Sequence, residues 1–456
     1  MRFRTIITAF SIVLAARAGF MPMAFAQDSN SSDQPQIIRD AEIEGIIRTW
    51  WTPILRAASL DPQATHIYIV QDPEINSFVA GGQNLFLNTG LLLRSQSPNQ
   101  VVGIMAHETG HIAGGHLVRS DRAMTKAMIA SIIAMAAGLA AGVAGHNSDA
   151  AAAGVLGGAE MGERNFMAFS VGQEASADHA ALSFLDRSHQ SARGLLQFFE
   201  MLQQDEMLAG LKEDPYLRDH PLTQDRVNYV RDHVAHSQWS DAKDPPEWIE
   251  MHKIMKAKLD AFMNAPAQVL ARYKADDQSI PARYARAIAY YRVPELKQAL
   301  ALIDGLIAAE PRNPYFQELK GQMLFENGHV ADAVAPYQQA VALAPDSALL
   351  KIEAAQVELE CEDAKLLGPA MVQLNEASHI ESDNPDLWRF LAIAYGRTGN
   401  MGMMSLSLAE QSMANGDWRG ARQQAARAIR LLPPGAQRQR AQDLADDATR
   451  ERERNN

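Results

Sequence analysis

The spacing of apolar residues predicts a first domain in which helices enclose a few short strands. Residues 37–60 carry apolar side chains at helical spacing, and residues 99–116 predict a second, more apolar helix. Between these segments lie three runs with strand character: 66–70, 76–80 and 84–88. Gly81-Gly82 separates the last two runs, which predicts a hairpin turn between them.

Helical patterns continue to the end of this first domain. They cover residues 170–186, 191–210 and 247–263, and the last of these is expected to be a connecting helix. Asp244-Pro245-Pro246 interrupts the regular pattern just before that helix. We therefore expect the first domain to span residues 27–262.

Residues 127–144 form an uncharged stretch within this domain. Its 18 residues reach the lower limit for a membrane-spanning helix, but most of them are small. The pattern favours a buried or membrane-surface helix, and a true membrane span is the alternative.

The C-terminal part of the chain repeats a helical unit. Small residues recur at the positions where two tetratricopeptide helices cross closely. Two sets of residues share that spacing: Gly321, Ala333, Tyr337, Ala340 and Pro345, then Ala409, Ala421, Ala425, Ala428 and Pro433. We expect residues 263–456 to form an all-α tetratricopeptide-repeat solenoid, so the whole chain is expected to be α+β and mostly α.

The N-terminus has the layout of a cleaved secretory signal. Arg2 and Arg4 precede an apolar stretch, and the small residues of Ala24-Phe25-Ala26 suit cleavage after Ala26. Residues 1–26 are therefore expected to be a signal peptide, and a retained N-terminal anchor is the alternative. With a single cysteine, Cys361, the exported chain fits a bacterial periplasm.

The composition and net charge of the chain argue against one class of binding partner, nucleic acids. Hydrophobic residues make up 47% and charged residues 21% of the 456 residues, which is typical of globular proteins. The net charge is −12, from 42 basic and 54 acidic residues. An acidic surface repels phosphate backbones, so we expect no nucleic-acid partner.

His107-Glu108-Thr109-Gly110-His111 is the motif with clear chemistry. Positions i and i+4 share one face of a helix, so both imidazoles can reach one metal ion while Glu108 lies beside its water. A catalytic zinc needs a third protein ligand and an open position. Glu174 is the best donor, and Asp178, on the same helical face, can accept the second N–H of a ligand histidine. The alternative ligands are His116, His146 and His179.

These motifs resemble the HtpX and CAAX prenyl protease family of zinc endopeptidases. The resemblance rests on the motif at 107–111 with Glu174-x-x-Ala177-Asp178, on residues 76–82 and 88–92, and on His220-Pro221 followed by Arg226. Ser77 replaces an alanine that is common in the family, and we expect this exchange to leave the site unaffected. The signal peptide and the repeats narrow the resemblance to periplasmic members.

The resemblance implies a fold, an activity and partners. It implies a zincin-like metallopeptidase domain with a small sheet, one Zn²⁺ per chain, and an endopeptidase that degrades misassembled outer-membrane proteins and assists β-barrel assembly. Unfolded outer-membrane proteins and the β-barrel assembly machinery are the expected partners, and contact with a membrane surface is a further expectation. The alternative is a repeat-based chaperone or adaptor whose peptidase site is largely latent.

The expected mechanism assigns a role to each site residue. His107, His111 and Glu174 hold the metal, and Glu108 is the general base. His220 and Arg226 match the family's His-Pro and following Arg, which makes them candidates to stabilise the oxyanion, and His220 is also a candidate for the fourth metal ligand. Asn76 is a candidate to bind substrate backbone at a strand end, or it serves a structural turn.

Overall fold

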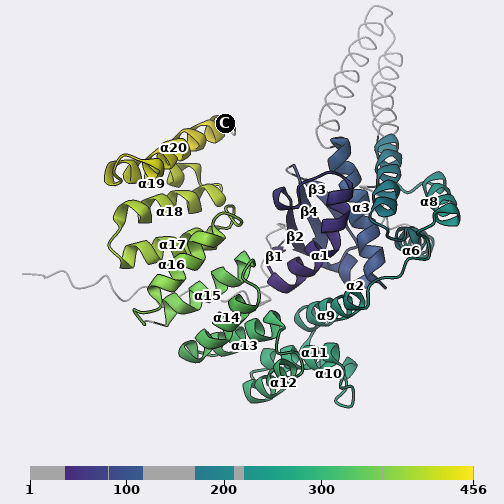
Figure 1. Cartoon of the computed structure of the whole chain (residues 1–456), viewed down its shortest axis with the longest axis horizontal. Coiled ribbons are helices and arrows are strands. Elements are labelled where there is room, and N and C mark those ends of the chain that lie inside the picture. Colours follow the sequence, from purple (N-terminus) through teal and green to yellow (C-terminus); the bar gives the residue numbers. More distant parts are fainter. Residues whose placement is uncertain (1–35, 81, 117–169, 210–219, 362, 455–456) are drawn as a thin grey trace, which may run out of the picture.

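The structure is a computed structural model, and it describes residues 36–80, 82–116, 170–209, 220–361 and 363–454 (Figure 1). The predicted signal peptide at 1–26, the uncharged stretch at 127–144 and His146 lie outside the described residues. Within the described part of the chain, no helix combines the length and the apolar character needed to cross a membrane.

A four-stranded sheet lies at the centre of the N-terminal unit. Its order is β1-β2-β4-β3, from β1 (Gln36–Ile38), β2 (His66–Gln71), β3 (Ser77–Ala80) and β4 (Asn84–Asn88). β3 and β4 pair antiparallel, which confirms the predicted hairpin, whereas β2 and β4 pair parallel. β3 is therefore an edge strand, and β1 is the other edge.

Helices lie against one face of this sheet: α1 (Ala41–Ala57), α2 (Thr89–Arg94) and α3 (Pro98–Gly114). A helix at 170–187, α6 (Arg193–Ala209), α8 (Gln224–His236) and α9 (Pro246–Met263) pack on these helices or on one another, and the short 3₁₀ helix η1 (Pro62–Ala64) precedes β2 (Figure 1). Ile37 and Ile38 were expected to be helical but belong to β1, because they pair with β2, and α1 begins only after its N-cap Asp40. Trp50 and Trp51 of α1 are fully buried in the core.

The remaining helices form a second, all-helical unit, here named the helical array. It comprises α10 (Pro266–Arg272), α11 (Ile280–Arg292), α12 (Leu296–Ala309), α13 (Pro314–Glu326), α14 (Val330–Leu343), α15 (Ala348–Glu360), α16 (Leu367–Ala377), α17 (Pro385–Arg397), α18 (Met401–Ala414), α19 (Trp418–Leu431) and α20 (Ala436–Arg454). Successive helices pack in pairs (Figure 1). A Cβ at Gly321 would lie 2.5 Å from the ring of Tyr337, so α13 and α14 cross where the repeat pattern places its small residue. The fold is thus α+β and mostly helical, as predicted.

The two units share apolar core residues. Met255 and Leu259 of α9 pack in the N-terminal core, whereas Ala257 and Ala261 of the same helix pack with α11 and α12. Ala41, at the start of α1, packs among residues of α14 to α17. The start of α1 and the helix α9 therefore join the N-terminal unit to the helical array.

A buried ionic cluster, here named the Lys258 cluster, lies at this junction. Lys258 Nζ is 2.8 Å from Asp40 Oδ2, 3.2 Å from Glu42 Oε2 and 3.7 Å from Glu318 Oε2, and Tyr284 donates to Glu42 at 2.8 Å. Burial alone would lower the pKa of Lys258, but the surrounding carboxylates raise it well above its usual value. The cluster links α1, α9, α11 and α13 through one cation.

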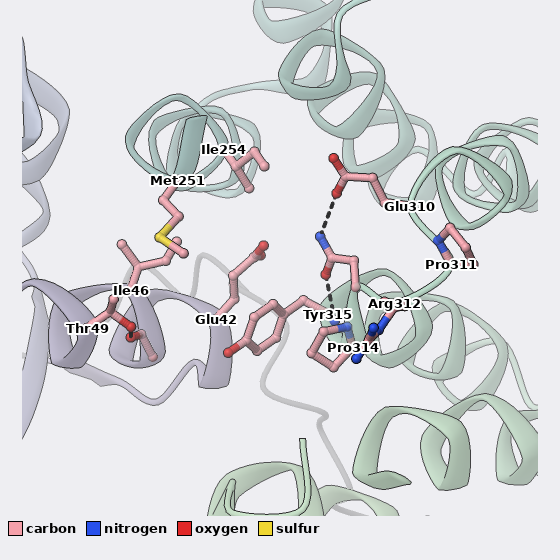
Figure 2. A pocket seen from close by; sticks show the side chains of 12 residues that line it. Glu42, Ile46, Thr49, Met251, Ile254, Glu310, Pro311, Arg312, Pro314 and Tyr315 are labelled. Carbon is pink, nitrogen blue, oxygen red and sulfur yellow. Dashed lines mark hydrogen bonds between the residues drawn. The ribbon is translucent and has the colours of Figure 1, made fainter. Parts of the chain in front are cut away.

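A cavity of about 570 Å³ lies beside this cluster. Figure 2 shows Ile46 of α1 and Met251 and Ile254 of α9 on one side of it, and Tyr315 of α13 on the other, next to Glu42. A Cβ at Gly45 would lie 2.6 Å from the Tyr315 hydroxyl oxygen, so α1 admits that tyrosine only because the position is glycine.

Candidate metal centre

The helix α3 holds the first two metal-ligand candidates. Ser97 caps its N-terminus by accepting a hydrogen bond from the backbone N–H of Gln100, and Gly115 ends it in the left-handed conformation at φ 60°. Both His107 and His111 are buried on the face that the i, i+4 spacing predicts. The Trp51 indole N–H donates to Thr109 Oγ1 at 2.8 Å, which ties the motif to the core of the N-terminal unit.

A close helix crossing brings the third candidate to this face. A Cβ at Gly110 would lie 2.6 Å from the carbonyl oxygen of Ala177, so the helix at 170–187 contacts α3 backbone to backbone. Glu174 is one turn before Ala177 on that helix, and its carboxylate is buried against the two histidines. The glycine within the histidine motif is therefore a packing requirement of the site.

The ligand atoms have the spacing that a tetrahedral metal ion needs. His107 Nε2 is 3.1 Å from His111 Nε2 and 3.2 Å from Glu174 Oε2, and His111 Nε2 is 3.3 Å from Glu174 Oε1. Atoms that surround zinc tetrahedrally at about 2.0–2.1 Å are about 3.3–3.4 Å apart. His220 completes the group, and the four ligand atoms all lie within 4.8 Å of one another. The residues therefore fit a bound metal.

The outer ring nitrogens of the two histidines are also occupied. His107 Nδ1 donates to Asp178 Oδ1 at 2.9 Å, which directs Nε2 toward the other ligand atoms. His111 Nδ1 lies 3.1 Å from His116 Nδ1. The structure thus places His116 behind His111, on the side away from the ligand group, and not among the ligands.

Arg226 reinforces the buried carboxylates. Its guanidinium contacts both oxygens of Asp178, at 2.6 and 2.9 Å, and lies 3.0 Å from Glu174 Oε2. It also donates to the carbonyl of Pro221 at 2.8 Å. Arg226 is a candidate to stabilise the oxyanion from the sequence, and in the structure its guanidinium is engaged by Asp178, Glu174 and the Pro221 carbonyl.

The local charges favour a cation. Burial alone would raise the pKa of Glu174 and Asp178, but the imidazole and guanidinium donors hold both pKa values below their usual range. Burial alone would lower the pKa of His107, but the same two carboxylates raise it to about 10. The negative potential that favours a proton on His107 equally favours a divalent cation.

Ser77 orients the carboxylate of Glu108. Ser77 Oγ donates to Glu108 Oε1 at 2.9 Å, and both side chains are buried. Glu108 Oε2 is buried with no hydrogen-bond partner among the described residues. The expectation that serine at position 77 leaves the site unaffected is therefore wrong, because its hydroxyl fixes the carboxylate.

His220 lies over the ligand group. Its Nε2 is 3.2 Å from the carbonyl oxygen of Ser77 and 3.7 Å from Glu108 Oε1, and these acceptors favour a proton on Nε2. Its Nδ1 faces the Glu174 carboxylate at 3.2 and 3.3 Å. His220 is buried, and residues 221–223 connect it directly to α8.

The remaining candidates lie near or outside this group. Asn76 directly precedes β3, and its carbonyl accepts from the backbone N–H of Asn88 at 3.0 Å, which closes the end of the hairpin. His179 is exposed and stacks on Tyr229 at a centroid distance of 6.2 Å, away from the ligands.

Comparison with known proteins decides the class of this site. The model of Peptidase family M48 matches residues 39–234, which include the motif at 107–111 and Glu174, Asp178, His220 and Arg226. Residues 39–234 are therefore similar to Peptidase family M48. The chain is a metalloprotease.

Relatives extend the similarity beyond residues 39–234. The chain is 23% identical over 394 residues to the Beta-barrel assembly-enhancing protease of Yersinia pestis, covering 82% of this chain and 76% of the relative. The Escherichia coli protein of the same name is 23% identical over 262 residues, 56% of this chain and 52% of the relative. Metalloprotease LoiP of Escherichia coli is 28% identical over 169 residues, 37% of this chain and 62% of the relative. The resemblance stated from the sequence is thus confirmed.

Proposed function

We propose that this chain is a zinc-dependent endopeptidase of the bacterial periplasm that degrades misassembled outer-membrane proteins and assists β-barrel assembly. The observation that carries the proposal is the tetrahedral spacing of His107, His111 and Glu174 beside the buried carboxylate of Glu108. The names of the relatives from Yersinia pestis and Escherichia coli support the β-barrel role. The signal-like residues 1–26 support the location.

The proposed mechanism assigns the metal to His107, His111 and Glu174, with Asp178 fixing the His107 tautomer. When bound, zinc supplies a Lewis acid and a nucleophilic water near neutral pH. Glu108 takes the proton of the attacking water on its unpartnered Oε2 and later passes it to the leaving amine. Ser77 holds the other oxygen, so the proton is exchanged at one defined atom.

We assign an extended substrate to the edge of β3. Asn76 and Asn88 are joined by a backbone hydrogen bond, so Ser77, one position on, directs its carbonyl away from β4. A substrate strand can pair with that open edge, with Asn76 at the end of the paired segment. In the structure His220 contacts the Ser77 carbonyl, so substrate pairing requires His220 to move.

His220 is proposed as a reversible lock. Its Nδ1 faces the ligand group, where it would lose any proton on binding the metal and, as a fourth protein ligand, would exclude the catalytic water, and its Nε2 covers the substrate edge. After His220 moves, its N–H is available to donate to the oxyanion, so both roles can alternate. This geometry is also the specific observation that favours the second candidate function, a repeat-based chaperone or adaptor with a latent peptidase.

Substitution of Glu108, the proposed general base, tests whether the chain hydrolyses peptides by this mechanism. Glu108→Gln is expected to abolish casein cleavage while zinc stays near one per chain, because Glu108 is not a ligand. His107→Ala, His111→Ala and Glu174→Ala are expected to lose zinc as well as activity. Normal cleavage by Glu108→Gln would refute the mechanism.

Two further assays separate the alternatives. Casein cleavage that stops on chelation favours the protease, whereas full β-barrel assembly activity without any chelator-sensitive cleavage favours the adaptor. Carbonate extraction tests the proposed periplasmic state, because a membrane-spanning protein stays in the pellet and a surface-bound protein is released.

A further inference from the structure

The face of the sheet that the helices leave uncovered carries a row of aromatic side chains. Tyr68 of β2, Phe86 of β4 and Phe78 of β3 are direct cross-strand partners in register. The rings of Tyr68 and Phe86 stack at 4.9 Å between centroids, and those of Phe86 and Phe78 at 4.8 Å. We name these three residues the aromatic row.

The row occupies positions where a sheet usually carries polar side chains. The neighbouring residues Ile69, Leu87 and Val79 point to the opposite face and are buried, as the alternation of a strand requires. The three aromatic residues remain partly exposed. Cross-strand aromatic pairs stabilise a sheet, but a stripe of them on an open face also offers apolar contact area to another chain.

Each end of the row adjoins a different part of the protein. At one end the Tyr68 hydroxyl donates to Asp383, between α16 and α17, and the Arg39 guanidinium lies 5.7 Å from the Tyr68 ring centroid. At the other end Phe78 follows Ser77, which contacts both Glu108 and His220. In Figure 1 the sheet lies on the side of the N-terminal unit that faces the helical array. The row therefore runs from the helical array to the edge of the metal site.

We propose that the aromatic row is a specificity surface that binds the outward-facing apolar side chains of an extended substrate strand paired with β3. The proposal rests on the proposed protease function. A strand added to β3 lies about 4.8 Å from it, so its residue opposite Phe78 continues the row by one position. Its residue opposite Ser77 points to the other face, toward Glu108.

This geometry defines the preferred substrate. Apolar or aromatic residues must alternate with residues that face the metal site, so the surface selects segments with a two-residue hydrophobic period. Such alternation is the pattern of a membrane β-barrel strand before it is assembled. A hydrophobic segment without alternation places apolar side chains on both faces and gains less from the row.

Charge near the row argues for a polypeptide and against a lipid surface. Asp383 contacts Tyr68 directly, and the Arg39 guanidinium is paired with both Glu44 and Glu381 at 2.8 Å, so the balance of charge at the end of the row next to the array is acidic. Acidic groups repel anionic lipids. The contact of Tyr68 with the array also makes this end of the row a corner between two units and not a flat surface.

Two peptides of identical composition test the proposal. One alternates Phe, Tyr and Val with Ser and Thr over roughly ten residues, the length of a membrane β-strand, and the other groups its apolar residues in blocks. Wild type is expected to cleave the alternating peptide with about tenfold higher kcat/KM. Phe86→Thr and Phe78→Thr, which remove the ring but introduce a residue that also favours strands, are expected to bring this ratio close to one.

Ile249→Thr is the matched control, because it removes an exposed apolar side chain from α9, away from the row. It is expected to keep the wild-type ratio. Direct binding of the two peptides to Glu108→Gln, with and without Phe86→Thr, gives a readout that does not depend on turnover. An unchanged ratio in both row variants, or a wild-type ratio of one, overturns the proposal.

Other occupants of the row have their own signatures. A wild-type dimer that Phe86→Thr dissociates in sedimentation, or phosphatidylcholine vesicle binding that it abolishes, with an unchanged peptide ratio, also overturns the proposal. Failure of the protease function is distinguishable, because then neither peptide nor casein is cleaved by any form while Glu108→Gln still reports peptide binding.

Discussion

Asp178 and Arg226 form a two-point ion pair next to His107, a candidate metal ligand. Arg226 Nε is 2.6 Å from Asp178 Oδ2, Nη2 is 2.9 Å from Oδ1, and the same Oδ1 accepts from His107 Nδ1 at 2.9 Å. The Asp178 carboxylate thereby fixes the ring of His107, and Arg226 in turn fixes that carboxylate. Both partners of the pair are buried, so its loss is not compensated by solvent.

Arg226→Lys is therefore expected to weaken zinc binding by about 10- to 100-fold, because lysine lacks the planar fork that contacts both carboxylate oxygens. Competition with a chromophoric chelator measures the change. Arg231→Lys on the same helix is the control, since Arg231 forms an exposed pair with Glu200. Equal zinc affinity in the two variants would contradict the positioning role.

His220→Ala is expected to increase the rate of peptide cleavage and to promote self-degradation, because it removes the residue that covers the Ser77 carbonyl and the fourth metal position. Peptide turnover and the stability of the purified chain over time measure the effect. If His220 acts mainly as an oxyanion donor, the rate falls by roughly 10²–10³-fold instead. An unchanged rate at equal zinc content would refute both roles.

Ser77→Ala is expected to lower kcat by about tenfold, the order of one hydrogen bond to a charged group, without changing zinc content. The hydroxyl holds Glu108 Oε1, so its loss leaves the base with more orientations. Steady-state kinetics and metal analysis check this result. Ser188→Ala, at a partly exposed turn, is the control and is expected to retain full activity. A normal kcat in Ser77→Ala would show that the contact does not orient the base.

Lys258→Met is expected to destabilise the chain by about 3–5 kcal/mol at neutral pH, because Asp40, Glu42 and Glu318 remain buried without their cation. Urea unfolding measures the change. Lys253→Met on the same helix removes an exposed pair with Glu250 and is expected to stay within about 0.5 kcal/mol of wild type.

Acidification is expected to reduce the loss of stability caused by Lys258→Met. Burial raises the pKa of Glu318 to about 7, so the folded state holds a proton that the unfolded chain, with an ordinary carboxyl pKa of 4.5, releases. Stability from that proton is present at low pH and is lost as pH rises through about 7. The Lys258→Met defect should therefore be smaller at pH 5 than at pH 8, and an equal defect at both would count against the cluster.

His252 gives the opposite dependence on pH. Burial, aided by Lys256, lowers its pKa to about 4 from the usual 6.5, and its Nε2 lies 2.8 Å from Ser95 Oγ. Between these two values the unfolded chain binds a proton that the folded chain does not, so stability falls by up to about 3 kcal/mol as pH falls from 6.5 to 4. In His252→Gln, the slope of unfolding free energy against pH in this window is expected to be shallower. An identical slope would show that His252 does not titrate in this way.

The periodicity of the sequence was sufficient to predict the helices and the hairpin whose hydrogen bonds join residues close together along the chain. The i, i+4 spacing of His107 and His111 and the alternating strands around Gly82 predicted α3 and the hairpin correctly. The start of α1 was misjudged, because residues 36–38 form a strand only through pairing with β2. The motif also indicated Glu174 and Asp178, which lie one turn apart on a single helix.

The sequence by itself determined the elements, the ligand types and the repeat spacing, because these depend on side-chain chemistry and on regular intervals. Only the tertiary structure decided which distant residues meet. It placed Ser77 on Glu108, Arg226 on Asp178, and Lys258 among carboxylates from α1 and α13. No interval along the chain encodes those contacts, since they follow from how helices and strands pack and from which buried charges must find partners.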